Sequence, residues 1–142
     1  MRGLLDINVL IALFDPDHPA HSGARGWLAG NAADGWASCP ITQNGTLRIM
    51  SQPAYPNPVP LHELLERLRE AAAHASHEFW PDDVSLLDRS VVDDAVTLGP
   101  KQITDVYLLA LATARKGRFV TFDRAVPLNL VRGAQRRNLA VL

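Results

Sequence analysis

Short apolar runs alternate along the chain with longer segments in which apolar residues recur every three or four positions. The short runs predict strands, and they lie at residues 4–5, 36–39, 78–80, 119–122 and 139–142. The longer segments predict helices at residues 9–14, from about residue 19, at 41–50, at 61–72 and at 103–115. Strands that alternate with helices are typical of a sheet whose neighbouring strands run parallel.

The ends of two predicted helices carry recognisable signals. Thr42 is predicted to open the helix at 41–50, and Gly117 follows the helix at 103–115 at the position where a left-handed cap is expected. The proline-rich stretch 53–60 is short enough to be a loop between two helices. No repeat or linker divides the chain, so a single domain is predicted over residues 1–142.

The predicted fold class is α/β, with a central, mainly parallel sheet of four to five strands and helices on both faces, since parallel neighbours need helical crossovers. Sites in such sheets form beyond the carboxyl ends of the strands. Asp6 follows the first predicted strand and Asp123 follows the strand at 119–122. Asp105 opens the long helix that precedes that strand.

Composition and charge narrow the function classes. The single cysteine, Cys39, excludes an internal disulfide and a cysteine-ligated zinc cluster. The longest apolar stretch, residues 107–114, is far shorter than the roughly 20 residues of a membrane-spanning helix, and we expect a cytoplasmic protein. Residues 62–94 carry nine acids and three bases, whereas 113–142 carry seven bases and one acid. This asymmetry makes a nucleic-acid partner possible.

Three aspartates form the candidate chemistry. Taken singly, Asp6, Asp105 and Asp123 can each be a helix or turn cap. Taken together, they place three carboxylates along one edge of one sheet, where their mutual repulsion requires a cation. Oxygen ligands without cysteine or suitably spaced histidine select Mg²⁺ or Mn²⁺, and Mg²⁺ commonly completes its shell with water and substrate phosphate.

Four segments carry a resemblance to a known family: LLDINVLIAL at 4–13, CPIT at 39–42, QITDVYLLALA at 102–112 and VTFDRA at 120–125. Together they resemble the PIN domain, and most closely the VapC-type ribonuclease toxins of bacterial toxin–antitoxin modules. The resemblance implies a PIN-like fold, Mg²⁺ or Mn²⁺ dependence, endonucleolytic cleavage of RNA, a homodimer, and neutralisation by a small cognate antitoxin.

Carried over by position, the resemblance assigns roles to individual residues. Asp6 and Asp105 would be direct metal ligands, and Asp123 would bind the metal through water or orient the attacking water. Asn8 and Thr121 would donate hydrogen bonds to these groups. The three aspartates are therefore both the metal-binding and the catalytic candidates.

The chain also departs from the family pattern. PIN nucleases usually carry a further glutamate on the helix after the second strand, but residues 41–50 contain no carboxylate. Gly45 or Gln43 occupies that position, depending on the alignment, and the sequence does not decide between them. A weaker metal site with three carboxylates follows, and a catalytically weakened domain that only binds RNA or an antitoxin is an alternative function.

Two further hypotheses concern the substrate. The basic residues Arg132, Arg136 and Arg137 either guide the RNA backbone to the carboxylates or form a solvated face. A haloacid-dehalogenase-like phosphohydrolase is a second alternative, but that class expects a DxD motif, and Asn8 stands at its second aspartate. Neither GxGxxG nor GxxxxGK occurs, which argues against dehydrogenases and P-loop enzymes.

Overall fold

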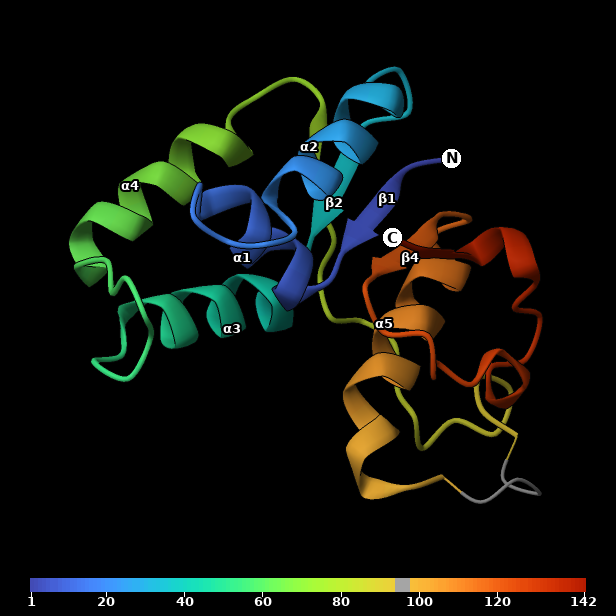
Figure 1. Cartoon of the computed structure of the whole chain (residues 1–142). Coiled ribbons are helices and arrows are strands. Elements are labelled where there is room, and N and C mark those ends of the chain that lie inside the picture. The colour runs from blue at the N-terminus through green and yellow to red at the C-terminus, as the bar shows by residue number, and fades with distance from the viewer. Residues whose placement is uncertain (94–97) are drawn as a thin grey trace.

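A sheet of five parallel strands forms the centre of the molecule, in the order β3–β2–β1–β4–β5 (Figure 1). This computed structural model describes residues 1–93 and 98–142. The strands are β1 (Gly3–Leu5), β2 (Trp36–Ser38), β3 (His77–Phe79), β4 (Arg118–Thr121) and β5 (Leu139–Val141). The predicted parallel α/β sheet is confirmed, and every predicted strand is present.

Helices cover both faces of this sheet. The helices are α1 (Ile7–Phe14), α2 (His21–Gly30), α3 (Pro40–Ser51), α4 (Leu61–Ala72) and α5 (Ile103–Ala114), with 3₁₀ turns at Pro100–Gln102, Leu128–Leu130 and Arg136–Asn138. In Figure 1, α1 to α4 gather on one side of the strands, while α5 lies on the other. No helix in the described part of the chain is long and apolar enough to span a membrane.

Alternation along the strands builds a core on each face. Leu4 and Phe119 pack with the apolar side of α5, whereas their neighbours Leu5 and Val120 pack with α1 and α2. All four side chains are fully buried. Side chains that point to opposite faces in this way are typical of a sheet that is covered on both sides.

Two helices begin earlier than predicted. The first begins at Ile7 rather than at residue 9, because the carboxylate of Asp6 accepts a hydrogen bond from the Ile7 backbone N–H and caps it. The third begins at Pro40, since proline is well suited to a first helical position. Thr42 therefore lies inside the first turn, where its hydroxyl accepts a hydrogen bond from the backbone N–H of Cys39.

The left-handed residue that ends α5 is not the one that the sequence predicts. The left-handed residue is Lys116, with φ of 56°, and not Gly117. The Lys116 and Gly117 backbone N–H groups donate to the carbonyls of Thr113 and Ala112, which is the Schellman pattern. Gly117 is required for space instead, because a Cβ there would lie 2.6 Å from the Trp80 ring and 2.8 Å from a backbone oxygen.

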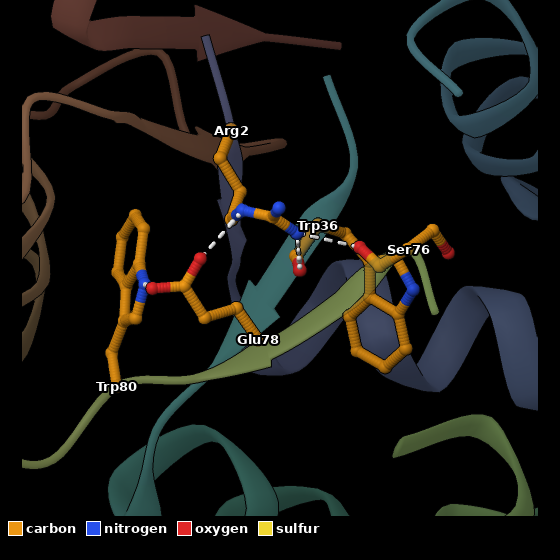
Figure 2. Close-up of polar contacts among 5 residues, drawn as sticks. All are labelled: Arg2, Trp36, Ser76, Glu78 and Trp80. Atoms are coloured by element: carbon orange, nitrogen blue, oxygen red, sulfur yellow. Dashed lines mark hydrogen bonds and ion pairs between the residues drawn. The ribbon is translucent and has the colours of Figure 1, made fainter. Parts of the chain in front are cut away.

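An arginine ties three strands together at the amino edge of the sheet (Figure 2). The Arg2 guanidinium donates to the backbone oxygens of Ser76, at 2.7 Å, and Trp36, at 3.3 Å. It also forms an ion pair with Glu78, which in turn accepts a hydrogen bond from the Trp80 indole. This network connects the strands at the edge of the sheet opposite to the candidate aspartates.

Candidate active site

Asp6 is the buried member of the candidate site. It follows β1 directly, and its backbone N–H donates to the carbonyl of Val120 on β4 at 2.9 Å. Its side chain is 5% exposed and accepts hydrogen bonds from the Ile7 backbone N–H and the Thr121 hydroxyl, both at 2.7 Å. Burial raises the pKa of Asp6 although both hydrogen bonds oppose that shift.

Thr121 connects two of the aspartates. Its buried hydroxyl donates to Asp6 and accepts a hydrogen bond from the backbone N–H of Asp123 at 3.0 Å. The Asp123 carboxylate accepts a hydrogen bond from the Ala125 N–H at 2.7 Å, so it caps the turn after β4. One hydroxyl therefore fixes the positions of both groups at the carboxyl edge of neighbouring strands.

Asp105 completes the acidic group from a different element. It lies half-buried in the first turn of α5. Burial raises its pKa to about 6, and the negative charges of Asp6 and Asp123 add to that shift. The structure therefore brings Asp6, Asp105 and Asp123 within electrostatic reach of one another.

The chemistry of this donor set fits a hard divalent cation. The charge of Asp123 disfavours ionisation of both Asp6 and Asp105, and a cation between the carboxylates would relieve that repulsion. Across residues 1–93 and 98–142, no three acidic, histidine or cysteine side chains are placed so that together they could hold a metal ion. The open arrangement suits Mg²⁺, which usually binds through one or two carboxylates and retains several waters.

Within the described residues, the other polar candidates, Asn8 and Gln43, form no hydrogen bond to the three aspartates. Asn8 is exposed on α1, and no hydrogen bond of its side chain is seen within the described residues. The Gln43 amide donates to the Ser38 hydroxyl at 2.8 Å, and that hydroxyl lies 2.8 Å from the His77 ring. Gln43 also lines a hollow with residues of α4, so its amide is engaged away from the carboxylates.

Gly45, the other candidate for the missing glutamate, could take a side chain only if the Ile7 side chain moved. A Cβ there would lie 2.4 Å and 2.7 Å from side-chain carbons of Ile7, because α3 packs closely on α1 at this point. Neither position supplies a fourth carboxylate.

The three arginines predicted to guide RNA have different surroundings. The Arg132 guanidinium forms an ion pair with Asp93, at 3.5 Å, and donates a hydrogen bond to the backbone oxygen of Arg89. It therefore connects its own segment to the segment that contains these two residues. Arg136 lines a hollow together with Arg124, which sequence reasoning missed although it directly follows Asp123. Arg137 is exposed on the same 3₁₀ turn as Arg136.

Comparison with known proteins now identifies the family. The family model described as the PIN domain matches residues 3–129, which include all three aspartates. The chain belongs to the PIN-domain family. The chain is 51% identical to Ribonuclease VapC44 of Mycobacterium tuberculosis, and the match covers the whole of both chains. It is 39% identical to Ribonuclease VapC39 of the same species, over 89% of this chain and 91% of the relative.

A solved structure supports the PIN-like fold. The crystal structure of VapBC2 from Rickettsia felis, bound to a DNA fragment from their promoter, matches with a TM-score of 0.58 at 13% identity. The match covers 100% of this chain and 98% of that chain. The predicted resemblance to VapC-type PIN domains is thus confirmed, and the haloacid-dehalogenase alternative loses its support.

Proposed function

We propose that this PIN domain is an Mg²⁺- or Mn²⁺-dependent endoribonuclease, a toxin that is neutralised by a small cognate antitoxin. One observation carries the proposal: three carboxylates gather at the carboxyl edge of the sheet, where burial, and in addition the charge of Asp123, raises the pKa of both Asp6 and Asp105. The chain that holds them is 51% identical, end to end, to a VapC ribonuclease. The predicted homodimer and the cytoplasmic location belong to the same proposal.

The roles of the side chains follow from their surroundings. Asp6 and Asp105 would hold the cation, Asp6 in an orientation fixed by the Thr121 hydroxyl and the Ile7 N–H. The bound ion would polarise a phosphate oxygen of the RNA and lower the pKa of a water. Asp123, exposed at the end of its turn, would orient the attacking water by accepting its hydrogen bond.

Cleavage of RNA by the purified protein tests the proposal. Wild type should cleave single-stranded or structured RNA when Mg²⁺ or Mn²⁺ is added, and it should stop when EDTA is added. Asp6→Asn keeps the size of the side chain but removes its charge, and it should lose cleavage. Equal cleavage by the variant would show that a contaminating nuclease is responsible.

A second candidate function rests on the absent glutamate. Since neither Gly45 nor Gln43 adds a carboxylate to the site, the domain has fewer charges for a cation than the usual family pattern. A binding module without turnover would bind RNA or the antitoxin equally well with and without divalent cations. Binding in EDTA together with no cleavage in Mn²⁺ would favour this alternative.

A further inference from the structure

A hollow of about 520 Å³ lies where the segment after β4 meets β5. Its lining consists of Arg124, Val126, Leu128, Arg136, Leu139, Val141 and Leu142. This volume falls within the roughly 300–1,000 Å³ that is usual for small-molecule sites.

The hollow adjoins the acidic edge through the backbone. Arg124 follows Asp123 directly in the chain. At the other wall, the Leu142 backbone N–H donates to the carbonyl of Thr121 at 2.9 Å, and the Thr121 hydroxyl holds Asp6. A ligand in the hollow would therefore lie next to the proposed site of cleavage.

The lining combines an apolar floor with positive charge. Leu128 and Leu139 are half-buried and pack against the core of the α5 side. Two guanidinium groups and no acidic side chain belong to the lining. Within the described residues, the side chains of Arg124 and Arg136 have neither an ion-pair nor a hydrogen-bond partner, whereas Arg132 pairs with Asp93.

This combination matches one nucleotide of an RNA strand. A guanidinium binds phosphate oxygens in a bidentate manner, and the flat face of an unpaired base stacks on guanidinium planes or covers apolar surface. The positive charge would also offset the repulsion between the RNA backbone and the three carboxylates. We propose that Arg124, Arg136 and the apolar floor between them hold a nucleotide adjacent to the scissile phosphate.

The inference rests on the proposed ribonuclease function and makes a separate kinetic prediction. The two arginines would bind substrate and take no part in the chemical step. Arg124→Ala and Arg136→Ala should each raise KM for a single-stranded RNA by about tenfold, with kcat within about twofold of wild type. Arg124→Lys keeps the charge but loses the planar fork, so its KM should lie between those of wild type and Arg124→Ala.

Binding supplies a second readout that does not need turnover. In an Asp6→Asn background, the affinity for a fluorescent single-stranded RNA is measured by anisotropy at several salt concentrations in EDTA. The double substitution of Arg124 and Arg136 by alanine should flatten the slope of log K against log salt by about 0.7, because the one phosphate of the bound nucleotide is then no longer neutralised.

Two further variants are compared with the arginine variants: the first is a control for the general loss of positive charge, and the second tests the hollow with a different substitution. Arg25→Ala removes an exposed arginine that lines a different hollow on α2, and it should leave KM and the salt slope unchanged. Val141→Asp adds a carboxylate to an exposed wall of the hollow, 41% accessible, without emptying the core, and it should weaken RNA binding.

The outcomes separate the hollow from the proposed function. If wild type cleaves RNA but the arginine variants match Arg25→Ala, the hollow is not an RNA site, although the ribonuclease function stands. A loss confined to kcat would also overturn the inference. If wild type cleaves no RNA, the proposed function fails, and the salt slopes alone show whether the hollow binds RNA. Displacement of RNA by an acidic peptide at equal concentration would assign the hollow to a protein partner instead.

Discussion

Asp105→Asn should stabilise the metal-free protein at neutral pH, because it removes a carboxylate whose negative charge is unfavourable in the folded state. Burial and the charges of Asp6 and Asp123 raise the Asp105 pKa from 3.8 to about 6. The folded state therefore binds a proton more tightly than the unfolded state between these two values. By linkage, the wild type loses stability as pH rises from about 4 to about 6, and the loss is complete above that range.

The size of the effect follows from the shift. About two pKa units correspond to about 3 kcal/mol at roughly 1.4 kcal/mol per unit. Asp105 is half-buried, and solvent screens part of this energy. We therefore expect Asp105→Asn to raise the free energy of unfolding by about 1–2 kcal/mol at pH 7.5 and to leave it nearly unchanged at pH 4.

Urea unfolding in EDTA, followed by the fluorescence of the buried Trp36 and Trp80, measures this difference at both pH values. Glu70→Gln is the matched control, since that exposed carboxylate lies on α4, away from the three aspartates, and its loss should change stability by less than about 0.5 kcal/mol. A variant that is less stable than wild type at pH 7.5, or that gains equally at pH 4, would refute the reasoning. Added Mn²⁺ should then stabilise the wild type more than Asp105→Asn.

Three further substitutions test the hydrogen bonds at the site and the packing of the fold. Thr121→Val removes the hydroxyl that holds Asp6 and Asp123, and Mn²⁺ affinity measured by calorimetry should fall about 10–100-fold; an unchanged affinity would show that the hydroxyl does not orient the carboxylates. Gly45→Glu places a carboxylate at one of the two positions that align with the usual family glutamate, but its Cβ would lie 2.4 Å from an Ile7 side-chain carbon, so urea unfolding should show a loss of about 1–3 kcal/mol; a variant as stable as wild type would contradict this. Gly117→Ala should lose about 1–3 kcal/mol in the same assay because its Cβ meets a ring and a backbone oxygen, whereas Gly23→Ala, which has open space on a helix, should not be destabilised.

The sequence predicted the sheet and the placement of the aspartates because these depend on local patterns. Apolar runs mark the strands, and Asp6 and Asp123 directly follow two of them, so the parallel topology brings both to one edge. The cap of Asp6 and the first-turn position of Asp105 are also local features.

The features that the sequence left open depend on contacts between distant segments. Gly117 looked like a left-handed cap, but the structure uses Lys116, and the glycine is needed where Trp80 approaches. The surroundings of Gly45 and Gln43 likewise depend on where α1 and β2 lie relative to α3, which the sequence does not give. The contacts of the Arg132 guanidinium with Arg89 and Asp93 join positions that are 39 to 43 residues apart, so its neighbours in the sequence did not indicate them.

The central claim is that Asp6, Asp105 and Asp123 act together on one divalent cation. A calorimetric titration of the purified protein with Mn²⁺ at pH 7.5 tests this claim most directly. We predict one bound ion per chain in the wild type and an affinity at least about tenfold weaker in Asp6→Asn and in Asp105→Asn. Mn²⁺ binding of equal strength in wild type and both variants would contradict the account.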